Sequence, residues 1–205
     1  MDTKVVVSEI QDSWETIIEK IKNGTANYAI GQYKPLDLGC QGVVNMQIVA
    51  IDNNDGNPLY DFVAMETLRM EHQINDWHSL TNEWEDSSMR LYLHKMIFLL
   101  IPETVRNAIK KAIKATISHS GNIRLTEDYL WIPSYEEIFG GKYGNIYHDA
   151  KSRQKVFAGT SCASDWWLRS AYSDYSDNFR GVTISGVASF NSADYSNGVA
   201  LGFSL

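Results

Sequence analysis

The segment from Trp166 to Leu205 constrains the fold more than any other part of the chain. It contains the pieces WWLRS, FRGVTIS, GVASF and GVALGFSL, which are short and rich in apolar, aromatic and β-branched residues. Such residues favour strands. Ser, Asp, Asn and Gly separate the pieces, and these residues favour turns. The segment therefore predicts a small, loop-rich β region at this end of the chain.

The first third of the chain predicts one helix followed by strands. Asp12 is expected to cap the helix, with Glu15 completing a capping box and Gly24 ending it. Apolar residues recur at helical spacing within it: Ile10, Trp14, Ile17, Ile18 and Ile21. Strand-like runs follow at residues 28–39, 46–51 and 59–65.

The residues DNNDGN, between the last two of these runs, favour a hairpin turn. Asp52, Asn54 and Asp55 also offer oxygen ligands of the kind that calcium binds, just before Gly56. The spacing does not fit the twelve-residue calcium loop, in which glycine takes the sixth position and glutamate the twelfth. A plain turn is therefore favoured over a calcium site.

The middle of the chain predicts two helices. Ser87 or Ser88 can cap the first, and Pro102 with Glu103 can start the second. The apolar face of the first comprises Met89, Leu93, Met96, Ile97 and Leu100. The second is expected to bury Val105, Ile109 and Ile113 and to expose Arg106, Lys110, Lys111 and Lys114.

Composition places the chain among ordinary soluble domains. Its 205 residues are 44% hydrophobic and 21% charged, which suits a single domain over residues 1–205 and argues against a disordered or coiled-coil chain. The net charge of −7 argues against a general nucleic-acid binder. The sequence shows no signal peptide and no run near the roughly 20 apolar residues of a membrane span. We therefore expect synthesis in the cytoplasm without membrane insertion, and association with a virion stays open.

The sequence lacks motifs of familiar catalytic sites. The five histidines have no zinc-binding spacing, and there is no G-x-S-x-G, phosphate loop or dinucleotide fingerprint. Cys40 and Cys162 are expected to be two ordinary buried thiols. Glu136 and Glu137 are adjacent, but Ser134 and Glu137 form a capping box, which favours a helix cap over a catalytic carboxylate pair. We expect no cofactor and no metal, although a catalytic set assembled only in three dimensions stays open.

The segment from Ser170 to Leu205 has the composition of a binding surface. Tyr172, Tyr175 and Tyr195 alternate with Ser, Asp and Asn, as in antibody loops, where tyrosine provides contact area and small polar residues provide hydrogen bonds. Plain turns would explain the polar residues but not the tyrosines. The segment also lacks Lys, Glu, Gln, Met and Trp. Changes at the adenines of an AAC or AAT codon cannot produce any of these five residues.

Several motifs together resemble a known family. They are W-x-x-S-x-M-R-x-Y-L from Trp84 to Leu93, the helix start at Ile101, Pro102 and Glu103, LWIPS from Leu130, WWLRS from Trp166, and Gly198-Val199. The order resembles an uncharacterised domain family of gut-type anaerobic bacteria and their prophages. Its members are similar to the variable proteins of diversity-generating retroelements, in which a reverse transcriptase rewrites adenines near the 3′ end of the gene.

The resemblance implies a C-type-lectin-like fold of the formylglycine-generating-enzyme type. This is an α+β fold, with two or three helices around a small twisted antiparallel sheet and long C-terminal loops. WWLRS and Gly198-Val199-Ala200-Leu201 stand here in place of the usual R-G-G-S-W-N and G-F-R motifs. The implied framework residues are Trp166, Trp167, Leu168, Arg169, Phe179, Val182, Gly186, Gly198 and Val199. The implied variable, ligand-contacting residues within 170–205 are Tyr172, Ser173, Asp174, Tyr175, Ser176, Asp177, Asn178, Arg180, Ser189, Asn191, Ser192, Asp194 and Tyr195.

The function implied is display of these residues to a protein or glycan ligand on a cell surface. The catalytic cysteines of the enzyme branch have no counterpart, which favours binding over catalysis. Two alternatives stay open: an enzyme or degenerate enzyme on the same scaffold, and a structural phage tail component. A homo-oligomer also stays open.

Overall fold

The protein has a mixed α+β fold, seen in a computed structural model that describes residues 5–54, 57–75 and 83–205. Among these residues the largest sheet has the strand order β1-β2-β3-β4-β12, and its first pair is parallel while the others are antiparallel. The strands are Ser8–Glu9 (β1), Gln32–Asp37 (β2), Val43–Asn54 (β3), Asn57–Ala64 (β4) and Gly202–Ser204 (β12). The last strand, β12, therefore pairs with β4, which lies in the first third of the chain.

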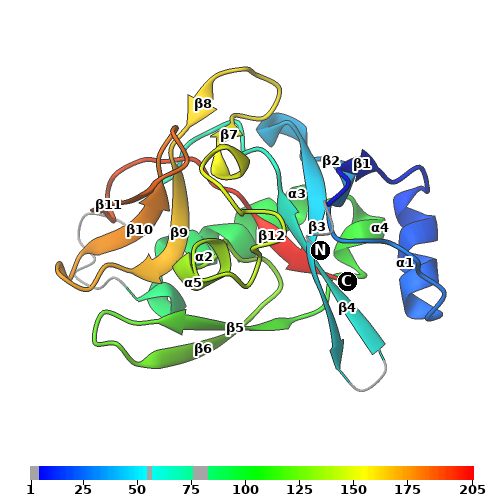
Figure 1. Ribbon diagram of the computed structural model, residues 1–205, viewed down its shortest axis with the longest axis horizontal. Helices are drawn as coiled ribbons and strands as arrows, with labels where there is room; N and C mark the ends of the chain where they lie inside the picture. Colours follow the sequence, from blue (N-terminus) through cyan, green and yellow to red (C-terminus); the bar gives the residue numbers. More distant parts are fainter. Residues whose placement is uncertain (1–4, 55–56, 76–82) are drawn as a thin grey trace.

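A second, antiparallel sheet has the order β11-β10-β9 and lies at the opposite end of the molecule from the first helix (Figure 1). Two hairpins, β5–β6 and β7–β8, complete the β structure of the described residues. The bounds are Ala112–Ile117 (β5), Ile123–Asp128 (β6), Lys155–Val156 (β7), Ala163–Ser164 (β8), Trp166–Ala171 (β9), Asn178–Val182 (β10) and Ala188–Ser192 (β11). The predicted C-terminal strands are thus confirmed.

The helices of the described residues are short. They are Trp14–Lys22 (α1), Ser88–Tyr92 (α2), Phe98–Leu100 (α3), Glu103–Arg106 (α4) and Tyr135–Ile138 (α5), with a π-helical turn at Leu93–Ile97 and 3₁₀ turns at Gly39–Gln41, Trp84–Asp86 and Lys151–Arg153. Ser87 caps α2 by accepting from the Arg90 N–H, and Ser134 with Glu137 forms the predicted capping box of α5.

The predicted cap of α1 is wrong by one residue. Ser13, not Asp12, is the N-cap, and its side chain accepts from the Thr16 N–H. Asp12 is instead engaged outside the helix end: its carboxylate accepts hydrogen bonds from Lys20 Nζ at 2.6 Å and from the Tyr28 hydroxyl at 2.8 Å. The helix therefore begins one residue later than the capping-box pattern indicates.

The predicted apolar face of the first middle helix is only partly buried. Met89, Leu93 and Ile97 are buried, whereas Met96 is 60% exposed. The π-helical turn explains the difference, because it widens the helix so that the buried positions recur every fourth residue. Met96 then lies off the buried stripe.

The second middle helix is much shorter than predicted, because the chain enters strand β5 soon after α4. In β5 buried and exposed residues alternate, so Ile113 is 68% exposed and Lys114 is 3% exposed, the reverse of the helical expectation. Val105 and Ile109 are buried as predicted. The helical reading failed because Lys114 is buried against a partner far away in sequence, Asp61.

Two smaller predictions have opposite outcomes. Cys40 and Cys162 are exposed, so the expectation of buried thiols is wrong. The hairpin between β3 and β4 is confirmed by the pairing of Asn54 with Asn57. Its tip, Asp55 and Gly56, and the side chain of Asn54 lie outside the described residues, so the calcium alternative is not addressed there.

The framework residues of the resemblance lie in the sheet β11-β10-β9 or in the segments next to it. Each of them is buried: Trp166, Trp167, Leu168, Arg169, Phe179, Val182, Gly186, Gly198 and Val199. Trp84 and Trp131 are buried in the same core. The tryptophans therefore belong largely to the interior, as their motif positions indicate.

Candidate ligand-binding face

In the sheet β11-β10-β9, strands β10 and β11 carry surface side chains, whereas β9 is buried on both faces from Trp166 to Ser170. Pairing places Arg180 opposite Phe190 and Asn178 opposite Ser192, and side chains that pair across antiparallel strands share a face. Phe179, the residue between Asn178 and Arg180, is completely buried. From Asn178 to Gly181, neighbouring positions on β10 thus face the surface and the core alternately.

The turn between β10 and β11 is fixed by a glycine. Gly186 has φ +78°, and a Cβ there would meet the Ala150 carbonyl oxygen. The Gly186 carbonyl accepts a hydrogen bond from Arg153 Nε at 2.9 Å. A side chain at this position would therefore require both a strained backbone and a displaced neighbour.

A buried ion pair anchors strand β9. The Arg169 guanidinium donates to Glu137 Oε2 at 2.6 Å, to Thr116 Oγ1 at 2.9 Å and to the Ile132 carbonyl at 2.7 Å. Burial alone would raise the pKa of the Glu137 carboxyl, but Arg169 outweighs burial and the pKa falls to about 2. The capping residue of α5 thus also holds the WWLRS strand, which the sequence did not indicate.

A second buried ion pair continues from the first and reaches the larger sheet. The Tyr143 hydroxyl lies 3.2 Å from Glu137 Oε1 and 3.0 Å from Asp61 Oδ2. Asp61 also pairs with Lys114 Nζ at 2.6 Å and accepts from the Ser204 hydroxyl at 2.6 Å. Burial lowers the pKa of the Lys114 amine, although Asp61 opposes this. These contacts connect β4, β5, α5 and β12 under the candidate face.

Three aromatic rings cluster on the outward face. The rings of Tyr172 and Phe190 stack with centroids 4.0 Å apart and planes 8° apart, and Tyr175 lies 6.1 Å from each. Tyr175 is 56% exposed and Phe190 is 42% exposed. Burial raises the pKa of the Tyr172 hydroxyl, and Asp174 raises it further. The cluster thus exposes an aromatic surface to solvent, and the Asp174 carboxylate lies next to Tyr172.

The cluster continues through an arginine toward α5. Arg180 Cζ lies 4.7 Å from the ring centroid of Tyr172 and 4.5 Å from that of Tyr135. The Tyr135 ring stacks on Phe139 with centroids 4.9 Å apart. Aromatic side chains from α5, from the residue after β9 and from β11 thus lie close to one guanidinium or to a ring that contacts it.

The structure brings most of the predicted contact residues together in two adjacent loops. The backbone N–H of Ala193 donates to the carbonyl of Asp177 at 2.8 Å, which joins the loop before β10 to the loop after β11. Ser192 donates to the Asp194 carboxylate, and Tyr195 is 61% exposed. The exposed members of the predicted set are Ser173, Asp174, Tyr175, Ser176, Asp177, Asp194 and Tyr195; Tyr172, Asn178, Arg180 and Ser192 are half-buried.

Two predicted contact residues lie on the other face of the sheet. Ser189 pairs with Gly181 and Asn191 pairs with Phe179, so both share the face of the buried ring. Both side chains are half-buried. They stand apart from Arg180 and Phe190, because adjacent residues of a strand point to opposite sides.

The sequence reasoning missed Phe190 and Tyr135. Phe190 occupies the position of β11 opposite Arg180, and the alternation of the strand could have indicated it. Tyr135 belongs to α5, and its backbone N–H donates to the Ser170 hydroxyl at 2.9 Å, which places the helix beside β9. No local signal in the sequence indicates that contact.

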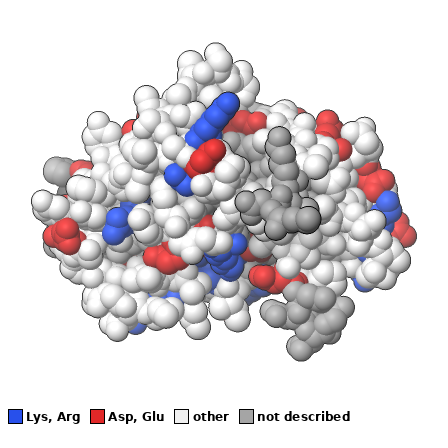
Figure 2. All heavy atoms as spheres, viewed as in Figure 1, with Lys and Arg blue, Asp and Glu red and all other residues white. Residues whose placement is uncertain are grey.

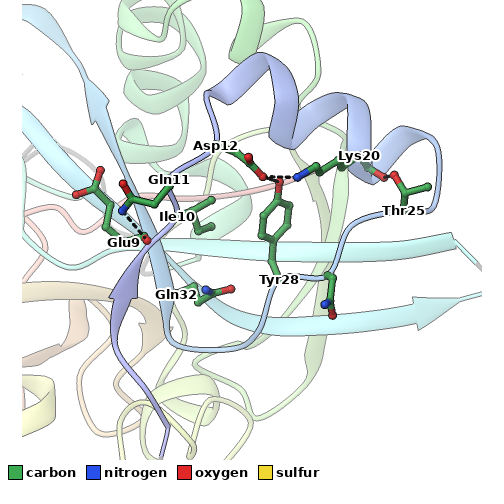
Figure 3. Close-up of a pocket in the computed structure, with 9 residues that line it drawn as sticks. Glu9, Ile10, Gln11, Asp12, Lys20, Thr25, Tyr28 and Gln32 are labelled. Carbon is green, nitrogen blue, oxygen red and sulfur yellow. Dashed lines mark hydrogen bonds and ion pairs between the residues drawn. The ribbon is translucent and has the colours of Figure 1, made fainter.

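A separate pocket lies beside α1 at the other end of the molecule (Figure 3). Asp12, Lys20 and Tyr28 line it and bond to one another across its wall. The described residues around this pocket include no histidine or cysteine. Asp12 and Lys20 in this pocket already form an ion pair with each other. The outward face of β9–β11 is therefore the better candidate for a binding site.

Neither a charged patch on one face of the molecule, shown in Figure 2, nor a metal-ligand cluster among the described residues marks a second site. On the face shown in Figure 2, basic and acidic side chains are scattered, and neither sign gathers into a patch. No three His, Cys, Asp or Glu side chains within the described ranges come together as metal ligands. None of the helices in these ranges is long and apolar enough to cross a membrane.

Comparison with known proteins identifies one family. The model of a family described as a domain of unknown function (DUF6273) matches residues 59–205. The match runs from β4 to β12 and includes the whole candidate face, whereas all the described residues that line the pocket beside α1 lie outside it. No curated protein and no solved structure matches the chain.

Proposed function

The chain belongs to the DUF6273 family, a domain of unknown function, and we propose that it is a ligand-binding display protein of the receptor or adhesin type. Its ligand is a protein or glycan of a cell surface, held against the outward face of β9–β11. One observation carries the proposal: the rings of Tyr175 and Phe190 are exposed and adjoin each other, while Phe179 on the opposite face of the sheet is completely buried. Rigid aromatic anchors on a fixed scaffold are typical of binding surfaces.

The separation of core and surface supports this proposal. Phe179 and Val182 are completely buried, while Arg180 and Asn178 on the same strand reach the surface. Surface side chains can therefore change without altering the packing beneath them. The two loops, joined through Ala193 and Asp177, form a continuous set of positions that tolerates substitution.

We further propose that the fold is C-type-lectin-like, of the formylglycine-generating-enzyme type, and that a retroelement diversifies codons within 170–205. The exposure of Ser173 through Asp177 and of Asp194 and Tyr195 supports this, because codons that vary should encode solvent-facing residues. The test is the DNA beside the gene. An imperfect repeat of its 3′ end that differs at adenines, next to a reverse transcriptase gene, is expected; without these, the retroelement proposal fails and the binding proposal stands.

Binding is tested with the purified chain, fluorescently labelled, on a glycan array and on a panel of intact bacterial cells. The variant Tyr172→Ala/Tyr175→Ala/Tyr195→Ala is expected to lose binding, and Tyr129→Ala, an exposed tyrosine beyond β6, is expected to keep it. The triple variant should change the free energy of unfolding by less than about 2 kcal/mol, because exposed ring stacks contribute little. A loss of several kcal/mol would show that the rings belong to the core and would refute display.

A further inference from the structure

The side chain of Arg180 lies over two aromatic rings. Its Cζ atom lies 4.5 Å from the ring centroid of Tyr135 and 4.7 Å from that of Tyr172. These distances are within the roughly 6 Å over which a guanidinium is attracted to a ring face. The guanidinium is thereby fixed in position before any ligand arrives, which lowers the entropic cost of binding through it.

The two rings are held by different elements. Tyr135 stacks on Phe139 and donates its backbone N–H to the Ser170 hydroxyl at 2.9 Å. Tyr172 stacks on Phe190 at 4.0 Å, and its backbone N–H donates to the Asn178 carbonyl at 2.9 Å. Each of the two rings thus has contacts of its own besides the one to Arg180.

The hydrogen-bond donors of Arg180 have no acceptor among the described residues. Other arginines of the chain differ: Arg169 donates to Glu137 at 2.6 Å, and Arg90 donates to Asp128 at 2.6 Å. The five N–H groups of a guanidinium lie along the edge of its plane, and a ring contact satisfies none of them as an acceptor oxygen would. That edge matches a carboxylate, which can accept two parallel hydrogen bonds.

The charges around Arg180 narrow the class of ligand. Asp174, Asp177 and Asp194 are exposed in the two flanking loops. Three exposed carboxylates in these loops, against one cation, disfavour a polyanion such as a nucleic acid or a polysulfate. The same carboxylates accept hydrogen bonds from hydroxyl groups. A sugar ring with one carboxylate and several hydroxyls fits this combination of one cation, several acceptors and an aromatic surface.

We infer that Arg180 is a carboxylate-binding subsite and that this chain binds a glycan that carries a carboxylated sugar. The inference rests on the proposed function, because it names the ligand class of the same face. The carboxylate takes the edge of the guanidinium in a bidentate pair, and the sugar hydroxyls donate to Asp174, Asp177 or Asp194. Tyr175 and Phe190 provide the apolar contact to the ring.

The experiment measures the affinity of the full chain for matched sugars by NMR titration. The probes are methyl β-D-glucuronide and the methyl α-glycoside of N-acetylneuraminic acid, each compared with the same sugar in which a hydroxymethyl group replaces the carboxylate. N-acetylglutamate amide provides a carboxylate from a protein-like source. At least one acidic sugar is expected to bind about tenfold or more tightly than its neutral partner, the ratio that one lost charge-assisted hydrogen bond produces.

Variants assign the effect to Arg180. Arg180→Lys keeps the charge but cannot form the bidentate, stacked contact, so it is expected to lose most of the preference for the acidic sugar, as is Arg180→Gln. Arg124→Gln removes an exposed charge from the β5–β6 hairpin and is expected to keep the preference. Thermal unfolding of each variant verifies that it is folded. If Arg180→Gln does not fold, the sugar preference of Arg180→Lys compared with that of the wild type still tests the role of Arg180.

Three outcomes would overturn the inference. Equal binding of acidic and neutral sugars, unchanged in Arg180→Lys, would exclude the subsite and leave the binding face intact. Tighter binding of N-acetylglutamate amide than of either acidic sugar would assign the face to acidic proteins. Binding of none of the probes would exclude a carboxylated sugar, while cell binding by the wild type and its loss in the tyrosine triple variant would still support the proposed function.

Discussion

Lys155 predicts an unusual dependence of stability on pH. Its side chain is 4% exposed, and its amine donates to the Ala64 carbonyl at 2.5 Å and lies 3.3 Å from the Met65 carbonyl and 3.4 Å from the Tyr147 hydroxyl. No carboxylate among the described residues forms an ion pair with it. Burial therefore lowers the pKa of Lys155 from 10.5 to about 7, and the charge of Glu66 opposes this only in part.

The direction of the effect follows from proton binding. Between pH 7 and pH 10.5 the unfolded chain carries a proton on Lys155 that the folded chain lacks. Raising the pH through this window therefore stabilises the fold by about 1.4 kcal/mol per pH unit. Between pH 7.5 and 9.5 the gain from Lys155 is about 2–3 kcal/mol. Below pH 7 Lys155 causes no further change in the free energy of unfolding, because it is protonated in both the folded and the unfolded chain.

The assay is urea unfolding of the wild type and of Lys155→Met at pH 7.5, 8.5 and 9.5. Lys114, whose pKa burial also lowers, contributes in the same direction in both proteins, so the difference in slope isolates Lys155. The raised pKa values of Tyr28 and Tyr147 act only above pH 10. Lys95→Met, at an exposed lysine, is the control and should keep the wild-type slope. Equal slopes in the wild type and Lys155→Met would refute the reasoning.

Three further predictions concern the supports of the candidate face. Glu137→Gln leaves the Arg169 guanidinium buried without its carboxylate and should cost about 3–5 kcal/mol of unfolding free energy, measured by urea denaturation at pH 7. Because the folded pKa of Glu137 is about 2 and its ordinary value 4.5, the wild type should lose stability as the pH falls from 4.5 to 2, and this loss should be smaller in the variant. Gly186→Ala should cost about 2–4 kcal/mol, because it combines a left-handed backbone with a clash at Ala150; an unchanged melting temperature would contradict the described turn. Phe179→Ala should cost about 3–5 kcal/mol and Phe190→Ala about 1 kcal/mol, and similar values for the two would contradict the separation of core and surface.

Local patterns predicted the parts of the fold that depend on neighbouring residues. The capping box of Ser134 and Glu137 requires only a few adjacent positions, and the strand pieces after Trp166 carry their own turn residues. The π-helical turn at Leu93–Ile97 shows the limit of this reasoning, since a helical repeat does not reveal where it widens.

Contacts between residues distant in the sequence determine the parts of the fold and of the candidate face that local patterns did not predict. Lys114 lies in a strand and is buried because Asp61, 53 positions away, provides its charge partner. Tyr135 joins the candidate face only because α5 packs beside Ser170, 35 positions further on. Of the face itself, the sequence indicated the tyrosine-rich loops and Arg180, but it could not indicate that Ser189 and Asn191 turn away from them. That division depends on the register of β10 with β11.

The position of β12 in the larger sheet limits which changes in the codons of the two exposed loops leave that sheet intact. The strand pairs with β4, and its Ser204 hydroxyl donates to Asp61, 143 positions earlier. These residues are encoded downstream of every position in the two exposed loops. A substitution in the loops leaves β12 unchanged, whereas a single inserted or deleted base there would replace it and remove the partner of β4. A shift of the reading frame in the loops would therefore remove the pairing of β12 with β4, whereas changes that preserve the frame keep it.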